Sequence, residues 1–229
     1  PTISKRKHWD PTPDADMRNA QEFFDEMERH LLEDEDPSQY LSSIADSQEL
    51  EQYPCRLLKE MQNTRQSPKH HPEGNDWNHT LLVVDQAAKR KQESANPRVF
   101  LWAAMLHDIG KPSTTRTRKG KITAYNHDKV GAKLAEEFLS YLHQEPSFIT
   151  AVCHLVRYHM HLLYVVNGLP FADIDAMMKD TDIGEVALLG LCDRLGRAGA
   201  DQRAEEEDIQ KFLEICYRQN NLGGTYGTE

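Results

Sequence analysis

Apolar residues recur every three or four positions through most of this chain, a spacing typical of α-helices with one buried face. The first such segment follows Asp16, a suitable helix cap, and ends at the acidic run 33–36. Its apolar positions are Ala20, Phe24, Met27 and Leu31. No stretch alternates apolar and polar residues for long enough to require a β-sheet. The pattern therefore predicts an all-α fold.

A predicted helix in the middle of the chain ends in polar residues that continue its buried stripes. The helix begins at Asn96, a cap followed by proline, and stops near Gly110. His107 continues the stripe of Phe100 and Ala104, and Asp108 continues the stripe beside it. Because a buried carboxylate without a partner is costly, a bound cation explains Asp108 better than packing does.

Two other predicted helices carry a similar residue. Asp193 extends the apolar stripe of Val186 and Leu189. His79 points inward near the start of a helix that is capped by Asn75 or Asp76 and runs to about Arg90. On its own, His79 would be explained by a hydrogen bond to a backbone carbonyl in the core. The metal hypothesis therefore rests on the set of residues rather than on any one of them.

Further along, His159 shares the stripe that begins at Phe148, whereas His154 falls off it. Helical phase therefore favours His159 over His154 as a ligand. His127 lies at the start of the preceding helix, for which Asp128 is the expected N-cap.

The formal net charge is −10, but its distribution is uneven. Residues 1–36 hold eleven acidic and five basic residues, so much of the acidity is peripheral. By contrast, the loop expected at 111–121 has no acidic residue and five cations, which are Lys111, Arg116, Arg118, Lys119 and Lys121. A basic loop beside a metal suggests an anionic substrate such as a phosphate ester. A merely solvated loop remains the alternative for its outer four cations.

The chain has no apolar run of membrane-spanning length and no apolar leader, so we expect a cytoplasmic protein with no membrane partner. The four cysteines are expected to be reduced core thiols. We divide the chain into an N-terminal arm and helical extension (1–54), a main domain (55–220) and a flexible tail (221–229).

Six motifs occur in an order and at spacings that resemble the HD domain of bacterial tRNA nucleotidyltransferases, the CCA-adding enzymes. They are His71-Pro-Glu-Gly74, Trp77-Asn-His-Thr80, His107-Asp-Ile-Gly-Lys-Pro112, Thr123-Ala-Tyr-Asn-His127, Val156-Arg-Tyr-His159 and Asp193-Arg-Leu-Gly-Arg197. The resemblance covers roughly residues 55–200. It implies an all-α HD-domain bundle with an N-terminal helical extension. The sequence shows no nucleotidyltransferase head, so we do not expect nucleotide addition.

The resemblance also implies a metal site. Its first-metal positions are matched by His79, His107, Asp108 and Asp193. Relatives with additional histidines are binuclear, so a second ion bridged by Asp108 and held by His127 and His159 is expected. This set of imidazoles and carboxylates suits Mn, Fe, Co, Ni, Mg or Zn, with one or two ions per chain.

Four cations near these ligands are expected to meet the substrate. Lys111 and Arg197 would neutralise charge on the transferred phosphoryl group, and Arg116 and Arg194 would add substrate contacts. The predicted catalytic residues are therefore Asp108, Lys111 and Arg197.

The predicted function is metal-dependent hydrolysis of phosphate esters on a nucleotide or an RNA 3′ end. The resemblance favours a 2′,3′-cyclic phosphodiesterase or 2′-phosphatase. A 5′-deoxynucleotidase and a non-catalytic nucleotide-binding HD module remain alternatives. The net charge of −10 argues against binding long duplex DNA, and nothing in the sequence excludes a homodimer.

Overall fold

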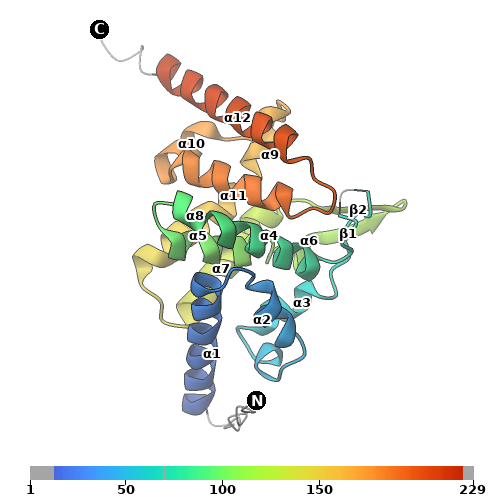
Figure 1. Cartoon of the computed structure of the whole chain (residues 1–229), viewed down its shortest axis with the longest axis vertical. Coiled ribbons are helices and arrows are strands. Elements are labelled where there is room, and N and C mark those ends of the chain that lie inside the picture. Colours follow the sequence, from blue (N-terminus) through green and yellow to red (C-terminus); the bar gives the residue numbers. More distant parts are fainter. Residues whose placement is uncertain (1–12, 70, 224–229) are drawn as a thin grey trace.

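The computed structural model describes residues 13–69 and 71–223, and helices dominate this part of the chain (Figure 1). The N-terminal half contains α1 (Pro13–Glu33), α2 (Ser38–Ser43), η1 (Glu49–Glu51), α3 (Arg56–Met61), α4 (Asp76–Arg90), η2 (Lys91–Glu93), α5 (Pro97–Leu106) and α6 (Lys111–Thr114). The C-terminal half contains β1 (Thr115–Arg118), β2 (Lys121–Ala124), α7 (His127–Tyr141), α8 (Pro146–Tyr158), α9 (His161–Val166), α10 (Ile174–Asp180), α11 (Ile183–Leu195) and α12 (Gln202–Gly223). The predicted all-α class is confirmed. No helix in the described ranges combines the length and hydrophobicity needed to cross a bilayer.

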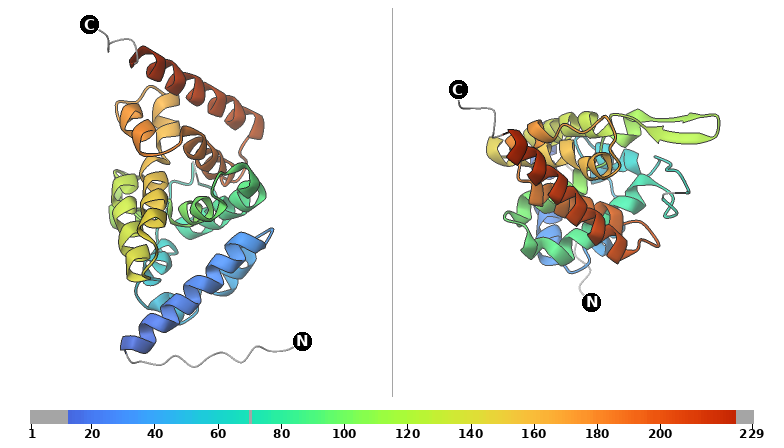
Figure 2. Two further views of the ribbon diagram at one scale, coloured as in Figure 1. Left: turned by 90° about the vertical axis from the view of Figure 1, so that its left-hand side faces the viewer. Right: turned by 90° about the horizontal axis from the view of Figure 1, so that it is seen from above.

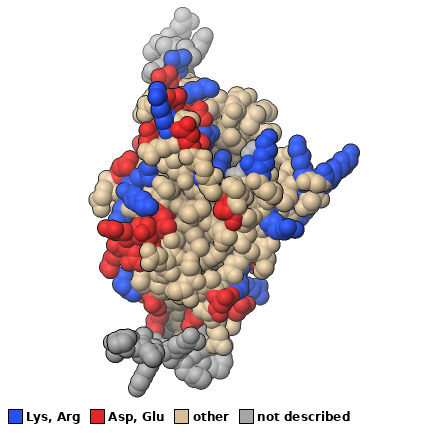
Figure 3. Space-filling model, turned by 45° about the vertical axis from the view of Figure 1, so that its right-hand side comes forward, with Lys and Arg blue, Asp and Glu red and all other residues tan. Residues whose placement is uncertain are grey.

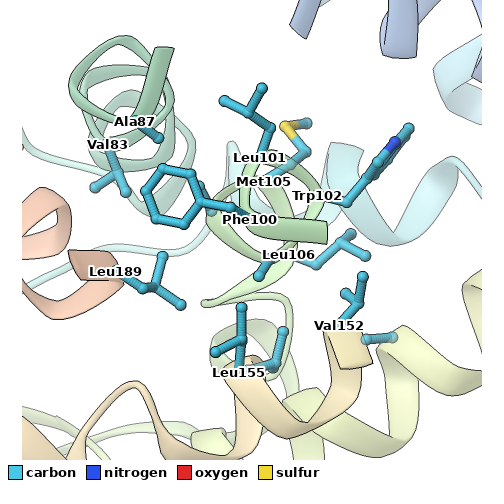
Figure 4. Close-up of a cluster of buried hydrophobic side chains, with 14 of the residues drawn as sticks. Val83, Ala87, Phe100, Leu101, Trp102, Met105, Leu106, Val152, Leu155 and Leu189 are labelled. Atoms are coloured by element: carbon cyan, nitrogen blue, oxygen red, sulfur yellow. The ribbon is translucent and has the colours of Figure 1, made fainter. Parts of the chain in front are cut away.

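Helix α5 forms the centre of the core. It is capped by Asn96, whose side chain accepts a hydrogen bond from the Val99 amide, and Pro97 occupies its first turn. From Val99 to Leu106 every side chain is buried, as expected for a helix that is apolar on all sides. Its side chains point toward α4, α8 and α11, which surround it (Figure 4).

Helix α1 packs on the outer side of α5. The rings of Phe24 and Trp102 stack with their centroids 4.2 Å apart. The Glu28 carboxylate accepts hydrogen bonds from Trp102 Nε1 at 2.8 Å and from Arg98 Nε at 2.7 Å. The helices placed in the N-terminal extension therefore share one core with the rest of the protein. Of the tail expected at 221–229, residues 224–229 lie outside the described residues, and 221–223 continue the backbone of α12.

The basic segment expected to be a loop instead forms α6 and the antiparallel hairpin β1–β2. Lys119 and Gly120 at its tip have φ of 51° and 75°, as a tight two-residue hairpin turn requires. The hairpin could not be predicted from the sequence because its strands are short and carry almost no apolar side chains.

The expected capping of α7 by Asp128 is wrong. The residue before the helix is Asn126, which has φ of 61° and makes no capping hydrogen bond with its side chain. Asp128 is buried within the first turn, where its carboxylate accepts a hydrogen bond from Arg157 at 2.6 Å. Asp128 therefore links α7 to α8 rather than ending a helix.

The turn after α5 lies directly against the start of α7. A Cβ atom added to Gly110 would lie 2.2 Å from the His127 carbonyl oxygen and 2.6 Å from the Gly131 amide nitrogen. No side chain fits between these two backbones. Gly110 therefore allows the approach that brings His127 beside Asp108.

We expect Gly110→Ala to destabilise the fold by about 1–3 kcal/mol, because the methyl group must displace backbone atoms. Gly131→Ala is the matched control at the same contact. The nearest atom to its Cβ would be Val156 Cγ1 at 3.3 Å, and alanine favours the helix by about 1 kcal/mol. Urea unfolding measures the free energy of unfolding of both variants. Equal stability of the two would refute this account of the contact.

Candidate metal centre

Four buried side chains from three helices converge at the end of α5. His107 ends α5 and Asp108 follows it, while His79 comes from the start of α4 and Asp193 from α11. Asp108 Oδ2 lies 3.1 Å from His107 Nε2 and 3.8 Å from His79 Nε2. His79 Nε2 lies 2.9 Å from Asp193 Oδ1. The fold thus brings together all four residues expected to hold the first metal.

A second group forms on the other oxygen of the same carboxylate. Asp108 Oδ1 lies 3.3 Å from His127 Nε2 and 3.7 Å from His159 Nε2. The two histidine nitrogens are 3.2 Å apart. Asp108 therefore presents one oxygen to each group, the arrangement of a carboxylate that bridges two metal ions. His154, by contrast, bonds the Asp180 carbonyl outside this group.

Backbone carbonyls orient three of these rings. In each ring Nδ1 lies within 2.8 Å of the carbonyl oxygen three residues earlier, in the pairs His107–Ala104, His127–Ala124 and His159–Val156. A carbonyl can only accept a hydrogen bond, so Nδ1 must carry the proton. The Nε2 lone pair is then available to a metal, as is usual for metal-binding histidines.

Glu73 lies beside Nδ1 of His79, where the other three rings have a backbone carbonyl. Its Oε1 lies 3.0 Å from His79 Nδ1 and 2.8 Å from His71 Nδ1. Burial raises the pKa of Glu73, but its bonds to these histidines outweigh burial and lower the pKa to about 2. Sequence reasoning gave Glu73 no role. The only sign was its place in the motif at 71–74, just before the helix that carries His79.

The cations predicted to meet the substrate have different surroundings. Lys111 is nearly buried, and its Nζ lies 2.5 Å from Asp108 Oδ2 and 2.7 Å from Gln66 Oε1. Arg197 Nη2 lies 3.4 Å from Asp193 Oδ2. Both therefore lie beside the proposed ligands.

Arg194 does not line the site. Its Nη1 donates hydrogen bonds to Glu205 at 2.6 Å and Asp208 at 2.5 Å. On a helix it points about 100° away from Asp193, so it faces α12 and holds that helix in place. Arg116 is exposed on β1, outside the cavity wall.

The electrostatics of the centre favour a cation. His107 Nε2 and Asp108 Oδ1 are buried without a hydrogen bond, a costly state for polar atoms. Burial lowers the pKa of His107, but Asp108 and Asp193 outweigh burial and raise it to about 9, so a metal ion would take the place of a proton on Nε2. Burial raises the pKa of Asp108, yet His107 and Lys111 hold it well below its usual value. Nitrogen and oxygen donors without thiolates fit a divalent metal ion.

This centre lies in the wall of a cavity of about 1010 Å³. The cationic side chains of Lys111, Arg157 and Arg197 also line it. The region from α9 to α10 supplies an apolar wall that includes Tyr164 and Phe171, whose rings meet edge to face at 5.5 Å. Phe171 is 60% exposed, so this wall can receive a ligand. Sequence reasoning missed Arg157 and the two aromatic residues.

We expect His159→Ala to lower the number of metal ions bound per chain, because it removes an Nε2 donor from the second group. His154→Ala, in the helix that His159 caps, is the matched control and should leave metal content unchanged. Metal analysis of both purified variants measures the number of metal ions bound per chain. A larger loss in His154→Ala would show that the second group is misassigned.

Sequence comparison relates the chain to bacterial CCA proteins. It is 30% identical over 144 residues to the multifunctional CCA protein of Actinobacillus pleuropneumoniae serotype 5b, covering 60% of this chain and 34% of that protein. It is 27% identical over 231 residues to the multifunctional CCA protein of Pseudomonas fluorescens strain SBW25, covering 86% of this chain and 51% of that protein. The chain thus spans between about a third and a half of the length of these relatives.

The family model of the HD domain matches residues 76–196, just over half of the chain. The matched segment contains all the histidines and aspartates of both ligand groups, whereas His71 and Glu73 precede it. The chain therefore belongs to the HD domain family and is related to the CCA-adding enzymes, as its motifs predicted.

Proposed function

We propose that this protein is a metal-dependent phosphohydrolase that acts on phosphate esters of nucleotides or RNA ends. The observation that carries the proposal is the Asp108 carboxylate, which presents one oxygen to each of two ligand groups in the wall of a large cavity. Membership of the HD family supports metal-dependent hydrolysis in general. A module that only binds nucleotides would not need two groups of metal ligands.

Two sets of residues would hold the metal. The first consists of His79, His107, Asp108 and Asp193, and the second of Asp108, His127 and His159. When bound, divalent ions at these positions would lower the pKa of coordinated water and polarise a phosphoryl oxygen.

The protein's own side chains would bind and orient the phosphate. Lys111, Arg157 and Arg197 line the cavity beside the ligand groups, so their charges are available to phosphoryl oxygens. Their placement would also stabilise the negative charge that develops during hydrolysis. Asp108 and Asp193 hold Lys111 and Arg197 in position through the contacts already described.

The size and walls of the cavity favour a nucleotide over a bare phosphate. A volume of about 1010 Å³ matches the upper end of small-molecule sites. Tyr164 and Phe171 offer aromatic faces against which a base can stack. The likeness to CCA proteins favours an RNA end or its nucleotides, with 2′,3′-cyclic phosphates and 2′-phosphates ranked first.

We expect His107→Ala and Asp108→Ala to abolish hydrolysis of bis-p-nitrophenyl phosphate in the presence of Mn²⁺, Co²⁺ or Ni²⁺, because each removes a central donor. Metal content should fall with activity, while the helical circular dichroism spectrum persists because the apolar core is intact. An unchanged metal content in both variants would refute the assignment of the centre.

The preferred ester can be identified by comparing 2′,3′-cAMP, 2′-AMP, 3′-AMP and dAMP at one concentration with one metal. We expect the cyclic and 2′ compounds to be cleaved fastest. Rapid cleavage of dAMP with the other compounds inert would assign the protein as a 5′-deoxynucleotidase. That result would overturn the ranking of substrates but not the metal centre.

A further inference from the structure

The hairpin β1–β2 carries cations that the metal centre does not use. Arg118 pairs across the hairpin with Lys121, and Arg116 lies two residues before Arg118. Because side chains alternate between the faces of a strand, these three cations project from one face of the ribbon. Lys119 adds a fourth cation at the tip.

These four side chains are exposed, and none of them forms an ion pair within the described residues. The hairpin projects from the helical body, and Lys and Arg side chains gather on it (Figures 2 and 3). The residues that line the cavity beside the metal centre include none of these four cations.

The base of the hairpin is nevertheless part of the cavity. Thr115 and residues 122–124 line its wall, and so do the exposed cations Arg65 and Lys129. The exposed ring of Tyr125 also lines it, directly after β2. A strip of positive charge with an aromatic ring therefore leads from the cavity along the hairpin.

The stability of the fold does not explain why these cations lie together on the hairpin. Like charges placed directly opposite each other on paired strands, as Arg118 and Lys121 are, destabilise the pairing. The strip is also unusual in a protein whose net charge is −10. A polyanionic partner would relieve the repulsion between these cations.

We propose that the hairpin binds the backbone phosphates of a single-stranded RNA whose 3′ end enters the cavity. This inference rests on the proposed function and specifies its substrate as an RNA end in preference to a free nucleotide. Cations that follow a backbone, with an aromatic ring for stacking, are typical of single-strand recognition. The terminal ester lies at the metal centre, and the preceding nucleotides lie along the hairpin.

The test compares two triple variants of the full chain. The hairpin variant carries Arg118→Thr, Lys119→Asn and Lys121→Thr, which maintain strand propensity and suit a tight hairpin turn. The control variant removes three exposed cations from α10 and α12 by Lys179→Gln, Arg203→Gln and Arg218→Gln. Both variants lower the net charge by the same amount, so only the position of the removed charges differs.

Binding is measured by fluorescence anisotropy with a labelled RNA of about six nucleotides that ends in a 3′-hydroxyl group. For the hairpin variant we expect the dissociation constant to rise about tenfold or more at low salt. The slope of log affinity against log salt should fall by about 0.7 for each RNA phosphate that the variant no longer neutralises. The control variant should bind as the unmodified protein does.

Hydrolysis provides the second readout. The hairpin variant should lose kcat/KM for an RNA ending in a 2′,3′-cyclic phosphate but retain it for 2′,3′-cAMP. Equal RNA binding by the two variants, or tighter binding of a duplex than of the single strand, would overturn the proposal. If the unmodified protein hydrolyses neither compound, the proposed function fails, while the binding comparison still decides the role of the hairpin.

Discussion

The buried carboxylate of Asp108 is the constraint on which this structure depends. Only 1% of the residue is exposed, and a charge at such depth is tolerated only where other charges compensate it. Lys111 and His107 approach one of its oxygens, and His127 approaches the other. The surrounding helices therefore bring these charged side chains to the Asp108 carboxylate.

The apolar core fixes the positions of the side chains around Asp108. Helix α5 is fixed on every side, so the position of His107 at its end is fixed as well. Gly110 then lets the backbone of α7 approach without an intervening side chain. The same packing therefore stabilises the fold and positions the side chains of the candidate metal centre.

The sequence predicted the parts of the fold that follow helical periodicity. His159 was preferred over His154 because buried stripes repeat every 3.6 residues, and the structure places only His159 beside Asp108. Contacts between a helix and a neighbouring loop or helix could not be predicted in this way. Arg194 pairs with residues of α12, and Glu73 reaches His79 from a loop. The hairpin is specified by its turn residues and its charged side chains, which a search for apolar alternation does not detect.

The hydrogen bonds from His107, His127 and His159 to carbonyls three residues earlier have a mechanical consequence. Each imidazole ring is hydrogen-bonded to the backbone of its own segment. A small displacement of that segment therefore moves the Nε2 atom by a similar amount. Catalytic geometry tolerates errors of only about 1 Å before rates fall steeply. Conservative substitutions deep in α5 or α8 should therefore disturb the geometry of the candidate metal centre before they unfold the chain.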